Sequence, residues 1–203
     1  MKLVLTGAKC SGKSKLGKAL AEILSLPFYE TDSMIEESFS SEYASALPCR
    51  AICSQYGEDF FRNLEKKVIE STETLDKCVI STGGSTLLNK DSRQILRKNS
   101  LLILIHVSVE VLLQRFSLKE IPAYLNNKTA KELFAARACL VNEVMTPYSD
   151  IIINSDILSF DETLNLLVKE TSSSLSFLQN RLKKQTLLES KSDIEIIKSC
   201  LLV

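Results

Sequence analysis

The sequence has no excess of charge of either sign and no long apolar run. Lys and Arg together number 25, as do Asp and Glu, so the formal net charge is zero. A chain without a basic surplus has no overall attraction for nucleic acid or for an anionic membrane. Its longest apolar stretch, LLILIHV from Leu101, is as long as a strand and far shorter than the ~18 residues of a membrane span. We therefore expect no nucleic-acid or membrane partner, and only local anion sites.

The sequence also gives no sign of disulfides, of a histidine-based metal site or of an export signal. The six cysteines are scattered without metal-ligand spacing, which favours reduced thiols in a cytoplasmic protein. The sole histidine, His106, has no partner that suggests nucleophile or metal chemistry, so a structural role is expected. No signal-peptide pattern follows the first residue. We expect a cytoplasmic protein and, as the simplest state, a monomer.

The remaining composition predicts one ordinary globular domain in which strands and helices alternate. Hydrophobic residues make up 45% and charged residues 25% of the chain, which is enough to build a core. Short apolar segments predict strands at about 2–7, 27–32, 78–84, 101–108 and 150–154. Helical periodicity predicts helices at about 16–24, 57–75, 92–98, 109–116 and 130–144. The expected fold class is α/β: a P-loop three-layer sandwich with a central, mostly five-stranded parallel sheet and helices on both faces.

Two segments stand outside this alternation. The polar stretch SLKEIPAYLNNKT, about 117–129, predicts a mobile loop that serves as a lid over the site. From Asp161 onward the pattern is helical and is interrupted by SSS at 172–174. We therefore divide the chain into a P-loop domain, 1–170, and a helical C-terminal extension, 171–203. The final CLLV matches a prenylation template in form, but packing of this apolar end on the body or on a second subunit is the favoured interpretation.

A phosphate-binding loop is predicted near the start of the chain. The sequence GAKCSGKS, 7–14, fits G-x-x-x-x-G-K-[ST] and lies between a predicted strand and a predicted helix. Backbone N–H groups of such a loop point at phosphate oxygens, while Lys13 adds positive charge and the Ser14 hydroxyl binds Mg²⁺. A chance turn is the alternative. The expected ATP contacts here are Gly7, Cys10, Ser11, Gly12, Lys13, Ser14 and Lys15. Cys10 either fills a gap, the favoured interpretation, or is an oxidisable thiolate.

Four segments in this order resemble the shikimate kinase family: GAKCSGKS, ETDSMIEE, YGEDFFRNLEKKVI and VISTGGS. The resemblance covers about residues 1–155 and is more specific than the phosphate loop alone. These enzymes are P-loop kinases of the nucleoside monophosphate kinase type. The resemblance therefore implies Mg²⁺-dependent transfer of the ATP γ-phosphate to the 3-hydroxyl of shikimate, which gives shikimate 3-phosphate and ADP in aromatic amino acid biosynthesis.

The resemblance also implies roles for individual residues of the acceptor site. Asp32 matches the aspartate that orients the attacking hydroxyl and accepts its proton, so Asp32 and Lys13 are the expected catalytic pair. Glu30 stands where the family commonly has another aspartate, near the waters of Mg²⁺. Arg62 matches the arginine that grips the substrate carboxylate, and Glu65, three residues on, lies on the same helical face to hold it. Solvated acids and a surface ion pair are the alternatives.

Other expected contacts depend on weaker matches, and some depart from the family. Gly83 and Gly84 match a three-glycine turn beside the substrate, but Ser85 replaces its third glycine. Arg137 matches a second carboxylate-binding arginine. Arg115 matches an arginine that stacks on adenine, or lies on a helix surface. The lid arginine of the family is missing from IPAY, 121–124, and Lys119 is offered as its replacement at the ATP phosphates.

Two other functions stay open at this point. One is a kinase of the same architecture that acts on gluconate or on a nucleoside monophosphate. The other is a degenerate relative that binds ATP without catalysis, which is motivated by the missing lid arginine and by Ser85.

Overall fold

The computed structural model describes residues 1–116, 127–182 and 193–201. Its centre is a five-stranded sheet with the strand order β2-β3-β1-β4-β5, and every neighbouring pair is parallel. The strands are β1 (Lys2–Thr6), β2 (Phe28–Glu30), β3 (Val79–Ser81), β4 (Ser100–His106) and β5 (Ile151–Asn154). All five predicted strands and the predicted α/β class are confirmed.

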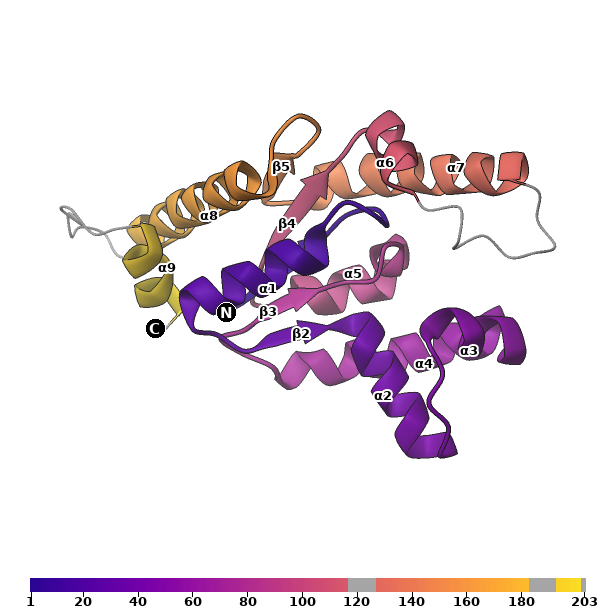
Figure 1. Cartoon of the computed structure of the whole chain (residues 1–203). Coiled ribbons are helices and arrows are strands. Elements are labelled where there is room, and N and C mark those ends of the chain that lie inside the picture. The colour runs from indigo at the N-terminus through magenta and orange to yellow at the C-terminus, as the bar shows by residue number, and fades with distance from the viewer. Residues whose placement is uncertain (117–126, 183–192, 202–203) are drawn as a thin grey trace.

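Helices cover both faces of the sheet, as the near-continuous apolar strands require. In Figure 1, α1 (Lys13–Leu24) lies in front of the sheet and α5 (Lys90–Arg97) lies behind it. Helix α1 also contacts α8 (Phe160–Leu182) and α9 (Asp193–Leu201), while α5 packs on α4 (Glu58–Ser71) and on β4. The remaining helices of the body are α6 (Val109–Arg115) and α7 (Asn127–Met145). The central strand β1 is buried along its whole length.

A small lobe beside β2 carries two helices that the sequence did not predict. Helix α2 (Thr31–Tyr43) begins directly after β2, and α3 (Cys49–Tyr56) leads into α4. The lobe has a core of its own, separate from the core around the sheet, formed by Ile35, Phe39, Ile52, Leu64 and Val68. It projects from the body at the edge of the sheet that β2 forms (Figure 1). The lobe thus adds a second wall beside the carboxyl ends of the strands.

The C-terminal region packs on the body of this chain. Helix α8 continues without a break through the three serines at 172–174, so the predicted interruption there is wrong. Thr171, Ser172 and Leu175 are buried, which shows that packing on the body overrides the weak helix preference of serine. In α9, Ile197 and Leu201 are buried in the main core. The division at 170/171 falls within α8 and stays a prediction.

Within the described residues, no helix is both long enough and apolar enough to cross a bilayer.

Candidate active site

The loop between β1 and α1 has the shape of a phosphate cradle. Gly12 precedes the first residue of α1 with φ +89°, a conformation that glycine adopts without steric cost. Gly7 allows a close approach, because a Cβ there would lie 2.6 Å from the carbonyl oxygen of Ile105. The N-terminus of α1 points its free N–H groups into the loop. The buried Ser11 hydroxyl has no hydrogen-bond partner within the described residues, and a bound phosphate would supply one.

Lys13 lies at the bottom of this cradle and is 8% exposed. Burial lowers the pKa of its ammonium group, and the nearby carboxylates of Asp32 and Glu30 oppose that change. Burial removes water from the Lys13 ammonium group, and the oxygens of a bound phosphate can replace that water. A buried lysine of this kind is therefore typical of a site that binds a polyanion. The structure thus brings together Lys13, Asp32 and Glu30, three residues that the sequence placed at one site.

Ser14 and Glu30 provide the type of oxygen ligands that Mg²⁺ prefers. The Ser14 hydroxyl donates a hydrogen bond to Glu30 Oε1, so the longer side chain of glutamate does reach the phosphate loop from the end of β2. A hydroxyl and a carboxylate fit an ion that keeps most of its waters and binds mainly through the nucleotide phosphates. Within the described parts of the chain, no group of three or more His, Cys, Asp or Glu side chains could hold a metal ion.

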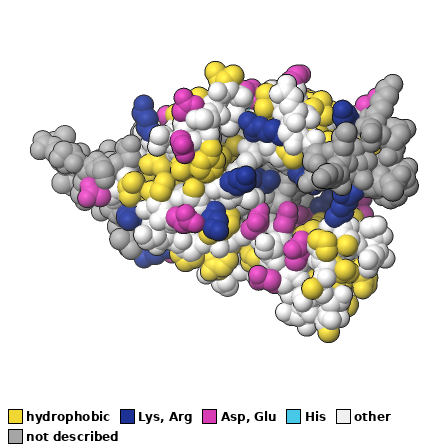
Figure 2. All heavy atoms as spheres, viewed as in Figure 1, with side chains coloured by type: hydrophobic (Ala, Val, Ile, Leu, Met, Phe, Trp, Pro, Cys, Tyr) yellow, Lys and Arg dark blue, Asp and Glu magenta, His cyan; other side chains and the backbone are white. Residues whose placement is uncertain are grey.

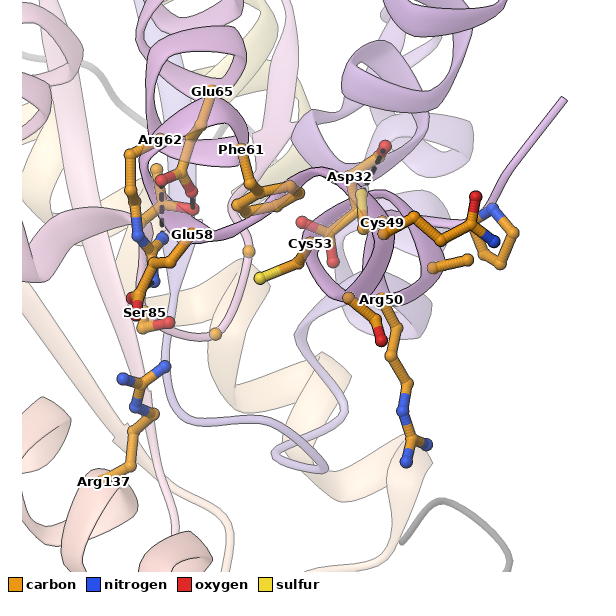
Figure 3. A pocket seen from close by; sticks show the side chains of 17 residues that line it. Asp32, Cys49, Arg50, Cys53, Glu58, Phe61, Arg62, Glu65, Ser85 and Arg137 are labelled. Atoms are coloured by element: carbon orange, nitrogen blue, oxygen red, sulfur yellow. Dashed lines mark hydrogen bonds and ion pairs between the residues drawn. The ribbon is translucent and has the colours of Figure 1, made fainter. Parts of the chain in front are cut away.

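Asp32 lies in the first turn of α2 and faces a cavity of about 920 Å³ between the lobe and the body (Figure 3). The side chain is open to this cavity, but its walls remove much of the water that would solvate a carboxylate. This desolvation raises the pKa of Asp32; Lys13 opposes the change, while Glu30 and Glu65 add to it. A carboxylate with a raised pKa is a better proton acceptor than a fully solvated one. Asp32 is therefore suited to orient a hydroxyl and take its proton.

Two ion pairs hold Arg62 at the cavity wall. Arg62 NH1 donates to Glu65 Oε2 at 2.7 Å, and NH2 donates to Glu58 Oε1 at 3.3 Å, all from α4. Glu65 is buried, with 7% of its side chain exposed, whereas 36% of the Arg62 side chain is exposed. The guanidinium is thus anchored on its inner side, and among the described residues it has further N–H groups without a partner. A planar guanidinium in this setting can bind a carboxylate through two parallel hydrogen bonds.

The turn after β3 needs glycine for lack of space. A Cβ at Gly83 would lie 2.5 Å from Asp32 Oδ1, and one at Gly84 would lie 2.9 Å from the backbone nitrogen of Lys9. The turn thus touches the acid on one side and the phosphate loop on the other. Ser85 has φ −134°, which any residue adopts, so the backbone does not require the third glycine of the family. Its side chain lines the same cavity.

Two further arginines complete the predicted set. Arg137 on α7 lines the large cavity, and Figure 3 shows its guanidinium directed toward the turn that holds Ser85. Arg115 lines a second, smaller cavity of about 140 Å³ together with Gly12 and Lys15. Its NH2 group donates to the carbonyl oxygen of Ser155 at 3.1 Å, which fixes the guanidinium beside the phosphate loop, where a base could stack. Lys119 and residues 117–126 of the lid lie outside the described residues.

Sequence reasoning missed the wall that α3 contributes. The large cavity is lined by Cys49, Arg50 and Cys53, and Figure 3 shows the sulfur of Cys53 directed into the cavity. The Cys49 thiol donates to the backbone oxygen of Asp32 at 3.3 Å. Burial, with the charges of Asp32 and Glu36, raises the pKa of this thiol, so Cys49 is a weak nucleophile. Helix α3 buries only Ile52, so a single core position marks this segment in the sequence.

Charged side chains concentrate around this cleft. Figure 2 shows dark-blue basic groups above magenta acidic groups across the middle of the face, where the surface is hollowed between body and lobe. A phosphate loop, a buried lysine beside a carboxylate, and guanidinium groups at the wall of the large cavity are the groups that P-loop kinases of small molecules use.

Comparison with known proteins identifies the family. The family model of shikimate kinase matches residues 9–172, so the chain belongs to the shikimate kinase family. The chain is 35% identical over 130 residues to a shikimate kinase of Bartonella henselae, a match that covers 64% of this chain but only 59% of that protein. It is also 35% identical over 159 residues to a shikimate kinase of Caldicellulosiruptor saccharolyticus, with 77% of this chain and 87% of that protein covered.

A solved structure agrees on the fold. The shikimate kinase of Acinetobacter baumannii in complex with shikimate superposes with a TM-score of 0.72 at 21% identity, and the match covers 90% of this chain and 95% of that one. The P-loop kinase fold predicted from the sequence is therefore confirmed.

Proposed function

We propose that this chain transfers the γ-phosphate of ATP to the 3-hydroxyl of shikimate, which gives shikimate 3-phosphate and ADP. The observation that carries this proposal is the proximity of Lys13, in the phosphate loop, to Asp32, which lines the large cavity together with Arg62 and Arg137. Family membership supports the same activity. A hydroxylated carboxylic acid fits a cavity that has a proton acceptor at one end and guanidinium groups at the other.

The geometry supports a role for each residue in this proposal. Arg62 and Arg137 bind the carboxylate of shikimate, and the backbone of Gly83 and Gly84 approaches its ring. Asp32 holds the attacking hydroxyl by a hydrogen bond and accepts its proton as the new P–O bond forms. Little covalent chemistry is required of the protein in such a transfer, so the rate depends on positioning and on charge.

On the nucleotide side, the ATP phosphates occupy the loop from Gly7 to Lys15, and the Lys13 ammonium neutralises charge on the β- and γ-phosphates. We propose that the hydroxyl of Ser14 binds Mg²⁺ and that Glu30 binds it through a water. The ion supplies further neutralisation of the transferred phosphoryl group. Arg115 holds the adenine over the smaller cavity. Lys119 is proposed to bring a cation from the lid to these phosphates in place of the missing arginine.

A cytoplasmic monomer is the proposed physiological state. The five cysteines whose side chains the structure describes are all free thiols, which supports a reducing compartment.

The experiment that tests the proposed activity is ADP release from ATP and Mg²⁺, with and without shikimate. The proposal predicts a rate that rises at least 100-fold on addition of shikimate and falls at least 100-fold in Asp32→Asn. Gluconate and nucleoside monophosphates serve as alternative acceptors. A higher kcat/KM for one of these would favour another kinase of the same fold, and ATP binding without transfer to any acceptor would favour the degenerate module.

A further inference from the structure

Thr86 lies directly behind the glycine turn and joins it to the arginine site. It is 1% exposed, and its hydroxyl donates a hydrogen bond of 2.8 Å to Glu65 Oε1. Its backbone nitrogen donates to the carbonyl oxygen of Gly83 at 3.3 Å. The same hydroxyl lies on the inner side of Gly83, because a Cβ at that glycine would lie 2.7 Å from Thr86 Oγ1. One buried side chain therefore contacts the turn and the carboxylate that supports Arg62.

The two oxygens of Glu65 have separate partners. Oε1 accepts from Thr86, which is 21 residues away in the sequence, and Oε2 accepts from Arg62 on the same helix. With only Arg62 bound, this carboxylate could turn about its side-chain torsions and carry the arginine with it. With both oxygens bound, the plane of the carboxylate is fixed. Because Arg62–carboxylate hydrogen bonds are directional, the guanidinium is then fixed as well.

Burial makes this contact energetically significant. The Glu65 carboxylate is almost fully removed from water, and a buried charged acceptor that loses its donor keeps its desolvation cost without compensation. The Arg62 side chain, by contrast, is open enough to adopt other rotamers. Loss of the Thr86 hydroxyl would therefore be relieved by movement of Glu65 and Arg62 toward the cavity.

We propose that Thr86 is a positioning residue for substrate binding: through Glu65, it holds Arg62 in the orientation that accepts the carboxylate of the substrate. This inference rests on the proposed function, since Arg62 is assigned there to that carboxylate. Thr86 does not touch the substrate in this account. Its effect should appear in binding of the acid and leave binding of the nucleotide unchanged.

The test compares two substitutions of Thr86 with a matched control. Thr86→Val keeps the shape and removes the hydroxyl, whereas Thr86→Ser keeps the hydroxyl and removes a methyl group. Thr82→Val is the control, because Thr82 is equally buried in the same segment but its hydroxyl has no partner within the described residues. The readouts are KM for shikimate, KM for ATP, kcat, the dissociation constant of shikimate by calorimetry, and the melting temperature.

We expect Thr86→Val to raise KM and the dissociation constant for shikimate about tenfold, with KM for ATP and kcat within about twofold of the unmodified protein. Thr86→Ser and Thr82→Val should stay within about twofold in every constant. Unchanged shikimate binding in a folded Thr86→Val protein overturns the inference. So does an equal loss for shikimate and ATP, or a loss that Thr86→Ser shares. If the unmodified protein neither binds nor phosphorylates shikimate, the proposed function fails, and this inference fails with it.

Discussion

The substitution Gly83→Ala tests the contact between the glycine turn and the catalytic acid. The new Cβ would lie 2.5 Å from Asp32 Oδ1, about 0.9 Å less than an ordinary contact of 3.4 Å. Gly83 is not among the residues with positive φ, so the backbone accepts alanine and the whole effect is steric. The opposing atoms are the ends of the Asp32 and Thr86 side chains. Thr86 is buried and bonded to Glu65, so Asp32, which is open to the cavity, is the side chain that moves. We therefore expect the acid to shift by most of an ångström while the fold is kept.

A displacement of about 1 Å at a reacting group costs on the order of 100-fold in rate. Gly83→Ala should therefore lower kcat about 100-fold in the coupled ADP-release assay, with a melting temperature within a few degrees of the unmodified protein. The matched control is Gly84→Ala, whose Cβ would meet the backbone of Lys9 at 2.9 Å. That change displaces the phosphate loop and should raise KM for ATP. A Gly83→Ala protein with kcat within twofold of the unmodified value would refute this reasoning.

Three further predictions concern protonation, the arginine site and the C-terminal helix. Desolvation raises the pKa of Asp32 above 3.8, and Glu65 adds to the shift. Because the acid must be ionised to accept a proton, kcat/KM should fall as the pH drops through this raised pKa. Glu65→Gln should lower the pKa of Asp32 and so move the acid limb of the kcat/KM profile to lower pH. A limb that does not move would contradict this. Arg62→Lys keeps the charge but loses the planar pair of donors, so KM for shikimate should rise about 10- to 100-fold while KM for ATP stays unchanged. An equal rise in both constants would exclude Arg62 as the residue that binds the carboxylate of shikimate. Ile197→Ala removes most of a fully buried side chain of α9 and should lower the free energy of unfolding, measured by urea titration, by about 2–5 kcal/mol. A change below about 0.5 kcal/mol would show that α9 does not stabilise the body.

Much of the sheet and of the nucleotide site could be predicted because their signals are local. Strands β1 and β4 each contain an unbroken apolar run, since helices cover both faces. The phosphate loop follows from a short motif in its expected setting between a strand and a helix. The carboxyl ends of parallel strands lie at one edge, so Asp32 and Gly83 were expected to be neighbours.

The lobe could not be predicted in this way. Helix α2 buries only Thr31, Ile35 and Phe39, and α3 buries only Ile52. Such narrow apolar stripes give a weak helical period, because most of the lobe surface is exposed or faces the substrate cavity. The contact between Thr86 and Glu65 lacks a local signal altogether, since it joins two segments that meet only in the folded chain.

Ser85 shows how the structure resolves a departure that the sequence leaves open. A serine in place of a family glycine suggests strain, but the conformation at this position is one that non-glycine residues adopt. The crowded positions are Gly83 and Gly84, where atoms of other residues occupy the space of a side chain.

The most direct test of the account is a crystal structure of the chain with shikimate, Mg²⁺ and a non-hydrolysable ATP analogue. The account predicts that Arg62 binds the carboxylate of shikimate through paired hydrogen bonds. It also predicts that Asp32 lies within about 3 Å of the 3-hydroxyl and that this hydroxyl faces the γ-phosphate beside Lys13. Shikimate bound elsewhere, or bound with its carboxylate away from Arg62 and its 3-hydroxyl away from Asp32, would contradict the account.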